Sequence, residues 1–330
     1  RSTLFPYTTL FRSPYSYAPL VIAGRKADYL MGNRTSTDLI TSNLEFDISE
    51  HLTLNLITGY VDLSQQYALD FFDGRSGPTL TSPIPPVRGF PRGGFTILND
   101  GEHDQFSQEI KVNGSLADGL IDFVAGGYYL DESNRTDFAD VLSIFNPAVP
   151  GGIALLLSDR VLHNDTEAYA GYVQADVNVT DKLKLTAGVR YTDETKDFSI
   201  RDNRPGCNDG TIEPTCMDDS NLFGPSGLAI PTSQSTELWT PRFAVNLKPN
   251  DSMLLFASAT RGFKSGGWNA RATTPSTFLP FGPERVWSYE VGVKSDWLDR
   301  RVRANLTLFY LDVSAIWRSE ERRVGKECRS

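Results

Sequence analysis

Residues 167–191 read EAYAGYVQADVNVTDKLKLTAGVRY and alternate apolar and polar positions over two consecutive segments. In the first segment, Tyr169, Val173 and Val177 share one face, while Gln174 and Asp176 lie on the other. A period of two is the spacing of a β-strand, and the polar turn TDK separates the two segments. The stretch therefore predicts an antiparallel hairpin with one apolar and one polar face.

The same alternation recurs along most of the chain. Several segments run 10–14 residues, which is longer than the usual strand of about five or six residues. We expect about ten strands, near residues 40–49, 52–63, 104–114, 120–132, 166–179, 183–193, 237–247, 253–262, 284–295 and 301–313.

The connections between these strands alternate between short and long. ISEHL, SLADGL, VTDKL, KPNDS and SDWLDRR are short polar turns, and Asp118-Gly119 is a favoured turn pair. The long connections are rich in Gly, Pro, Ser, Asn and Asp, and lie near residues 64–103, 133–165, 194–236 and 263–283. Loops of this length are uncommon within a compact soluble domain.

An all-β transmembrane antiparallel barrel explains these features together. A sheet spans lipid only when it closes, its strands need about 9–11 residues, and its turns are short on one side and long on the other. Aromatic residues near strand ends fit interfacial girdles, and these are Phe46, Tyr60, Tyr129, Tyr169, Tyr191, Trp239, Trp287 and Tyr310. The alternative is a soluble β-sandwich, which also has apolar and polar faces but does not explain the loop order.

The two ends of the chain share an unusual relationship at the level of DNA. RSTLFPYTTLFRS (residues 1–13) and RSEERRVGKECRS (residues 318–330) are encoded, in frame, by opposite strands of one DNA segment that resembles a sequencing adapter. We expect both ends to be adapter-derived, leaving residues 14–317 as an internal part of a barrel.

Composition excludes several classes of protein. The net charge is −9 for 330 residues, and it becomes −13 without the two ends, which hold seven basic and three acidic residues. An acidic chain lacks the electrostatic signature of nucleic-acid binding. No apolar run reaches the roughly 18–20 residues that a transmembrane helix needs.

Two cysteines lie close together in a loop outside the ends. Cys207 and Cys216 bracket CNDGTIEPTC, whose composition favours a tight loop. We expect a local disulfide and an oxidising compartment, with two free loop thiols as the alternative.

The segments LLFASATRGFKSGGWNA (254–270) and PFGPERVWSYEVGVKSDWLDRRVRANLTLFYLDVSAI (280–316) resemble TonB-dependent outer-membrane receptors. Residues 261–269 and 283–313 carry the specific match, and the resemblance extends more loosely over 36–317. It implies a barrel of 22 strands with an N-terminal plug domain and a TonB box. About ten of these strands are expected here, and the plug, the TonB box and the closing strands are not seen in this sequence.

The resemblance implies active uptake of a bulky solute across the outer membrane of a Gram-negative bacterium, most often a ferric siderophore. Lipid, the TonB complex and the small-molecule ligand are the implied partners, and no cofactor is implied. Vitamin B12 or a glycan remain alternative cargoes, and a passive pore or an adhesin remains an alternative class.

Candidate ligand contacts are the cationic and aromatic residues of loops and strand tops, which suit an anionic chelate. They are Arg88, Arg92, Arg261, Phe263, Lys264, Trp268 and Arg271. The alternative is a girdle of aromatic residues among solvated charges.

We expect no enzyme activity and no metal site of the protein's own. His51, His103 and His163 are far apart in the sequence and form no catalytic set. The carboxylates Glu109, Asp176 and Glu290 lie at polar-face positions of strands, where solvated wall residues are expected.

Overall fold

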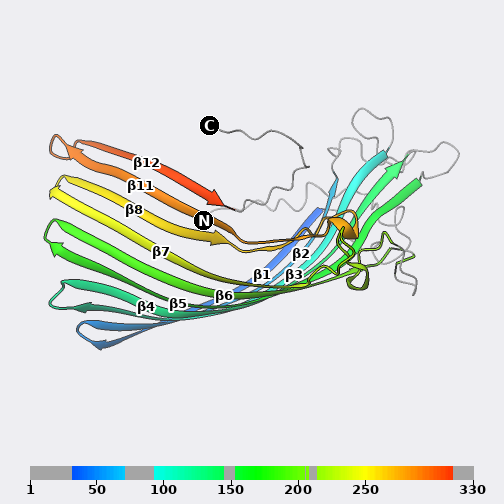
Figure 1. The fold of residues 1–330 in the computed structure, drawn as a ribbon, viewed down its shortest axis with the longest axis horizontal. Helices are drawn as coiled ribbons and strands as arrows, with labels where there is room; N and C mark the ends of the chain where they lie inside the picture. The colour runs from blue at the N-terminus through cyan, green and yellow to red at the C-terminus, as the bar shows by residue number, and fades with distance from the viewer. Residues whose placement is uncertain (1–31, 71–92, 145–152, 205, 208–213, 315–330) are drawn as a thin grey trace, which may run out of the picture.

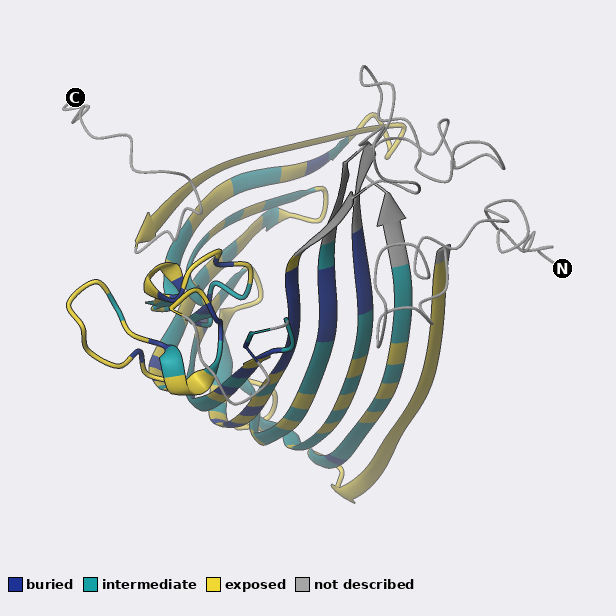
Figure 2. Cartoon of the chain, turned by 90° about the vertical axis from the view of Figure 1, so that its right-hand side faces the viewer, coloured by how far each residue is buried: buried dark blue, intermediate teal, exposed yellow. Residues whose placement is uncertain are grey.

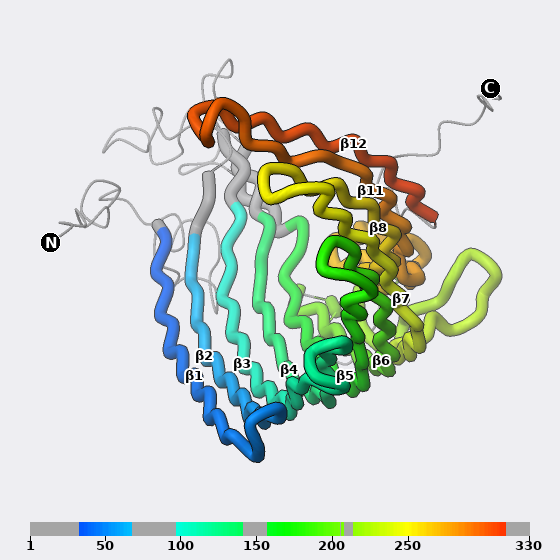
Figure 3. Tube along the Cα trace, turned by 90° about the vertical axis from the view of Figure 1, so that its left-hand side faces the viewer, coloured from blue at the N-terminus to red at the C-terminus, as the bar shows by residue number. Residues whose placement is uncertain are grey.

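The computed structural model describes residues 32–70, 93–144, 153–204, 206–207 and 214–314, and ten long strands make up most of them. They form one sheet in the order β1-β2-β3-β4-β5-β6-β7-β8-β11-β12, and every neighbouring pair is antiparallel. Figures 1 and 3 show this sheet curved into a trough whose edges are β1 and β12. The strands are β1 (Gly32–Ser49), β2 (Leu52–Asp70), β3 (Gly93–Leu116), β4 (Ile121–Ile144), β5 (Ile153–Thr180), β6 (Leu183–Asp202), β7 (Ser233–Asn250), β8 (Met253–Lys264), β11 (Glu284–Trp297) and β12 (Val302–Ser314).

The expected alternation of short and long connections is confirmed. Two to four residues join β1 to β2, β3 to β4, β5 to β6, β7 to β8 and β11 to β12, all at one end of the sheet (Figure 1). Within the turn from β3 to β4, Gly119 has a φ of +88°, a left-handed conformation that glycine adopts without steric cost. The connections at the other end span 71–92, 145–152, 203–232 and 265–283, and we call this end the long-loop end.

The strands are longer than the alternation predicted. β5 has 28 residues, which at about 3.3 Å per residue extend about 90 Å, whereas about 9–11 residues cross a bilayer. The expected loop near 133–165 is therefore wrong for most of its length, because β4 and β5 pair through it from Ser133–Asp165 to Ile144–Ile153. His103 lies within β3, opposite Leu63 of β2, and His163 lies within β5, opposite Arg135 of β4.

The predicted two faces are present across the whole sheet. Residues directly opposite each other in an antiparallel pair share a face, so the register extends one face from strand to strand. Leu185, Val245 and Leu255 lie on the face that we call the apolar face, and all three are exposed. Glu109, Asp176 and Glu290 lie on the opposite face, which we call the polar face.

Aromatic side chains form a belt across the apolar face. Each lies eight to eleven residues along its strand from the short-turn end, about the length that crosses a bilayer. Some neighbouring rings are in contact, with centroids 5.0 Å apart for Tyr129 and Tyr169, and 4.8 Å apart for Tyr191 and Trp239. The belt, which we call the aromatic girdle, comprises Tyr60, Phe106, Tyr129, Tyr169, Tyr191, Trp239, Tyr289 and Tyr310.

Three glycines of the sheet lie beneath an aromatic ring of the opposite strand. A Cβ added to Gly126 would lie 2.5 Å from the Tyr172 hydroxyl oxygen, and one added to Gly292 would lie 2.5 Å from the Phe256 ring. Gly114 is covered by the Phe123 ring in the same way. The rings fill the space that the glycines leave, which stabilises the register between the neighbouring strands.

The described loops add little regular structure. β9 (Gly267–Trp268) pairs with β10 (Pro280–Phe281), and the short 3-10 helices η3 (Asp219–Asn221) and η4 (Pro275–Thr277) complete the elements. Among the described residues, no helix is long and apolar enough to cross a membrane.

Candidate functional site

The described parts of the loops 203–232 and 265–283 fold against the sheet at the long-loop end (Figure 2). Phe198 and Ile200 of β6 lie on its polar face, and they contact the buried Met217 of the first loop and Phe278 of the second. The Phe198 ring lies 5.4 Å from Trp268 and 5.0 Å from Phe278 between ring centroids. We call the whole cluster the loop core: Phe138, Leu162, Phe198, Ile200, Met217, Leu222, Ile230, Trp268, Ala272 and Phe278.

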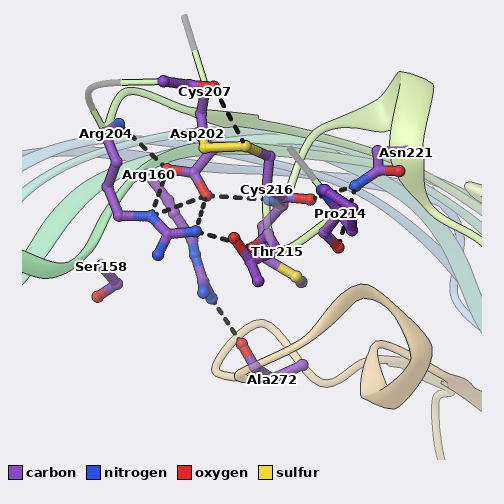
Figure 4. Close-up of polar contacts among 12 residues, drawn as sticks. Ser158, Arg160, Asp202, Arg204, Cys207, Pro214, Thr215, Cys216, Asn221 and Ala272 are labelled. Atoms are coloured by element: carbon purple, nitrogen blue, oxygen red, sulfur yellow. Dashed lines mark hydrogen bonds and ion pairs between the residues drawn. A yellow bond between two sulfur atoms is a disulfide. The ribbon is translucent and has the colours of Figure 1, made fainter. Parts of the chain in front are cut away.

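A disulfide closes the first loop beside this core. Cys207 and Cys216 are bonded, with their Cα atoms 5.6 Å apart, so the expected pairing is present. Cys216 is fully buried, and Asn221 donates a hydrogen bond from Nδ2 to its carbonyl oxygen at 2.9 Å. Figure 4 shows the disulfide directly above a group of charged side chains.

The central charge of this group is Asp202, which is fully buried at the end of β6. Its carboxylate accepts hydrogen bonds from Arg204 Nη2 at 2.8 Å and from the Met217 backbone N–H at 2.9 Å (Figure 4). Burial alone would raise the Asp202 pKa, but the bonds from Arg204 and from the backbone outweigh it, so the pKa lies below its usual value. Arg204 Nη2 also donates to the Thr215 carbonyl oxygen at 2.8 Å.

A second buried charge connects the sheet to the other loop. Arg160 of β5 is 3% exposed, and its Nη1 donates to the Ala272 carbonyl oxygen at 2.7 Å. Burial lowers the Arg160 pKa, and the nearby Asp202 opposes that shift. β5 and the β8–β11 loop are far apart in sequence, so this bond is a long-range contact. It holds the loop against the long-loop end of the sheet.

Arg271 is an exposed cation on the second of these loops. Its side chain is 50% exposed, and its Nη1 lies 3.1 Å from the Asp140 carboxylate. Its guanidinium also lies 4.8 Å from the Phe138 ring centroid. These contacts orient the guanidinium, while the side chain as a whole remains half-exposed and accessible to an anionic ligand.

The structure distributes the predicted ligand residues over different surfaces. Arg88 and Arg92 lie outside the described residues. Arg261 and Phe263 lie on the same face as the aromatic girdle, opposite Trp287 and Arg285 of β11. Lys264 ends β8 opposite Glu284 and is exposed.

Trp268 does not lie on an open surface. Its ring is 9% exposed within the loop core, and its Nε1 donates to the Pro231 carbonyl oxygen at 2.7 Å. Its place is therefore between the two loops, where it joins them. Of the predicted set, Arg271 alone combines exposure with a place on the described loops above the polar face.

The sequence analysis missed Arg160, Asp202 and Arg204. The signal for Arg160 was present, since Asp159-Arg160 interrupts the apolar run IALLLSDRVL, and a charged pair within an apolar strand is buried with partners. In the described ranges, no group of three or more His, Cys, Asp or Glu side chains is placed to bind a metal ion.

The sheet has long antiparallel strands, one exposed apolar face with an aromatic girdle, and folded loops at its long-loop end. These features define the wall of a transmembrane barrel. The family described as "TonB dependent receptor-like, beta-barrel" matches residues 2–315, and the chain belongs to this family. Its members are transport receptors of the outer membrane of Gram-negative bacteria, not enzymes.

Individual relatives agree with this family. The metal-pseudopaline receptor CntO of Pseudomonas aeruginosa is 28% identical over 149 residues, which are 45% of this chain and 18% of that protein. The ferric yersiniabactin uptake receptor FyuA from Yersinia pestis is similar in structure, with a TM-score of 0.62 at 16% identity over 85% of this chain and 36% of that chain. The ferric-catecholate import receptor Fiu of E. coli K12, in its closed form, gives 0.57 at 17% identity over 88% and 43%. The chain thus spans about a fifth of the length of its curated relative.

Proposed function

We propose that this chain forms part of the barrel wall of an outer-membrane receptor that takes up ferric siderophores with energy supplied through TonB. The observation that carries the proposal is the spacing between the short turns and the aromatic girdle, which matches one bilayer crossing. Above the girdle, the strands continue to a mouth covered by ordered loops. A membrane wall with a structured mouth is what capture of a solute requires.

The proposed cargo follows from the relatives together with the charge of the mouth. Receptors named for ferric yersiniabactin, ferric catecholates and metal-pseudopaline share this family or fold. Many chelates of this kind are anionic, and Arg271 has a half-exposed side chain at the long-loop end. We propose Arg271, Lys264, Arg88 and Arg92 as cations that face the ligand, and Arg261 and Phe263 as residues of the outer rim.

The proposed organisation places other parts of the receptor outside this sequence. Residues 14–317 would supply about ten of 22 strands, with residues 1–13 and 318–330 derived from an adapter. A plug domain and a TonB box would belong to the full-length polypeptide. The charged side chains of the polar face, such as Glu109 and Glu290, would then form a polar wall around the plug.

Uptake of radioactive iron by cells that express the full-length receptor tests the proposal. Accumulation of an added ferric siderophore should require TonB and should stop when the proton gradient is dissipated. Accumulation that continues without TonB would indicate a passive pore, and binding without accumulation would indicate an adhesin.

A substitution at the mouth tests the ligand surface separately. Arg271→Ala should weaken binding of an anionic chelate by roughly 10- to 150-fold, because a charged hydrogen bond contributes roughly 1.5–3 kcal/mol. Lys182→Ala, in the short turn between β5 and β6 at the opposite end, is the matched control and should bind as the wild type does. Equal affinity for Arg271→Ala and the wild type would remove Arg271 from the proposed surface.

A further inference from the structure

Two glycines on the apolar face lack the covering ring found at Gly114, Gly126 and Gly292. Gly127 of β4 and Gly171 of β5 lie directly opposite each other. A Cβ added to Gly171 would meet nothing within 4 Å, and one added to Gly127 would meet only the Ala170 carbonyl oxygen at 3.9 Å. No contact within the described protein therefore requires glycine at either position. Glycine in a strand interior weakens the strand and often marks a close approach by a ligand.

The paired glycines form the floor of a groove of about 460 Å³. Ile110 of β3 lies on one side, Tyr191 of β6 on the other, and the girdle rings of Tyr129 and Tyr169 lie above. The volume falls within the range of ligand sites, about 300–1,000 Å³. The groove opens on the apolar face just below the aromatic girdle, at the depth where the hydrocarbon of a bilayer would meet its headgroups.

The rim of the groove toward the long-loop end carries negative charge. The Glu167 carboxylate accepts hydrogen bonds from the hydroxyls of Tyr129 at 3.2 Å and Tyr169 at 2.7 Å. Asp131 lies directly opposite Glu167, and Asp193 lies directly opposite Tyr169. On the same face, β4 carries Arg135 two same-face positions beyond Asp131, and its Nη1 lies 3.6 Å from the Glu102 carboxylate of β3. At the next two positions beyond the rim on β5, β6 and β7, the described chain places no Lys or Arg.

We propose that the groove binds a membrane lipid that has an amine headgroup, with one acyl chain over Gly127 and Gly171 and the ammonium group at the carboxylates of the rim. The apolar floor excludes water and accepts methylene groups, while the rim attracts a cation and repels an anionic headgroup. A lipid fixed in this way would fill the only part of the described girdle region where two opposing residues lack side chains. The inference rests on the proposed placement in a membrane.

Native mass spectrometry of the full-length receptor, extracted from vesicles of phosphatidylethanolamine and phosphatidylglycerol, tests the inference. Gly171→Leu fills the groove, and we expect retained phosphatidylethanolamine to fall about tenfold, since two lost methylene contacts suffice for that change. Ala175→Leu adds a similar side chain on the same strand and face beyond the groove, and should retain lipid as the wild type does. Equal retention by Gly171→Leu and the wild type would overturn the inference.

A second pair of substitutions tests the headgroup. Glu167→Gln keeps an oxygen acceptor for both tyrosine hydroxyls but removes the charge, and Asp193→Asn removes the neighbouring charge. The wild type should retain phosphatidylethanolamine in preference to phosphatidylglycerol, and the double variant should lose this preference. Preference of the wild type for phosphatidylglycerol would contradict the proposal. Failure of the wild-type receptor to insert into vesicles at all would instead contradict the membrane placement, and with it the proposed function.

Discussion

The loop core packs against the same sheet that forms the girdled wall, yet the two regions differ in how far their apolar side chains are buried. On the wall, Leu306 and Leu308 of β12 are 60% and 63% exposed, while in the loop core Phe278 and Met217 are fully buried. The wall faces outward toward lipid, where apolar exposure costs nothing. The loop core lies beyond the girdle, where apolar side chains must be covered by protein because the surroundings are aqueous. β6 contains both kinds of position, since Leu185 is exposed on the wall and Ile200 is buried in the loop core. The surroundings of each residue therefore decide whether its apolar side chain must be covered by protein.

The largest expected effect is on the loop core. Phe278→Ala should destabilise the packing of the loops 203–232 and 265–283 by about 3–5 kcal/mol, because it removes a fully buried ring. Hydrogen exchange of these loops in the full-length receptor should accelerate accordingly. Phe223→Ala is the matched control, since Phe223 is 47% exposed in the first loop and should have little effect. Equal acceleration by both variants would mean that the core does not hold the loops.

The next effect tests the wall. Val245→Arg places a charge on the apolar face between Trp239 and the end of β7, and should lower the free energy of unfolding in vesicles by about 2–4 kcal/mol. Asn246→Arg on the adjacent polar-face position should be nearly neutral. Denaturant titration of the vesicle-inserted receptor measures both, and a larger cost at Asn246 would reverse the assignment of the two faces.

A smaller effect concerns the glycines beneath rings. Gly292→Ala brings a Cβ to 2.5 Å from the Phe256 ring and 2.7 Å from the Leu306 carbonyl oxygen, so we expect a loss of about 1–3 kcal/mol. At Gly262, the nearest atom to an added Cβ is Val286 Cγ1 at 3.5 Å, an ordinary contact, so Gly262→Ala is the control. Unfolding midpoints in vesicles compare the two, and similar values would show that the ring does not require glycine.

The smallest effect depends on pH. The Asp202 pKa is lowered in the folded state, so its contribution to stability is complete above the unfolded value of about 3.9 and disappears as the pH falls through the folded value. Asp219 has a raised pKa through burial, so its contribution is complete below the unfolded value and decreases as the pH rises through the folded value.

Hydrogen exchange of residues 214–232 between pH 6 and pH 3 measures the Asp202 effect. The loop should open as the pH falls below about 4, and Asp202→Asn should make exchange less dependent on pH in that range. Loop protection that increases on acidification would show that Asp219 dominates instead.

The sequence was sufficient to predict the strands of the wall and their two faces, because alternation and turn chemistry are local features. The pattern around Val173 and Asp176 assigned both residues to the correct faces, and the register confirms them. The extent of the strands was not predictable, because β4 and β5 continue through residues 133–144 and 153–165 without strict alternation. Pairing with a neighbouring strand, which composition does not reveal, maintains them there.

The loop core was less predictable because its contacts are distant in sequence. Arg160 and Ala272 are 112 residues apart, and Trp268 packs against Phe198 of another hairpin. An aromatic residue beside glycines in GFKSGGWNA suggests an exposed contact, but the structure uses Trp268 to join two loops. The disulfide was predictable because Cys207 and Cys216 are neighbours in one loop.

The length of β4 has a consequence for an arriving solute. From Tyr129 of the girdle to Ile144, the strand extends about 50 Å, which at a tilt of about 45° raises its end by about 35 Å. In physiological salt the electric field of a charged lipid surface decays over about 8 Å. With the wall placed in a membrane as proposed, the rim stands several such lengths above the headgroups. An anionic solute would thus reach the rim without first being repelled by the cell surface.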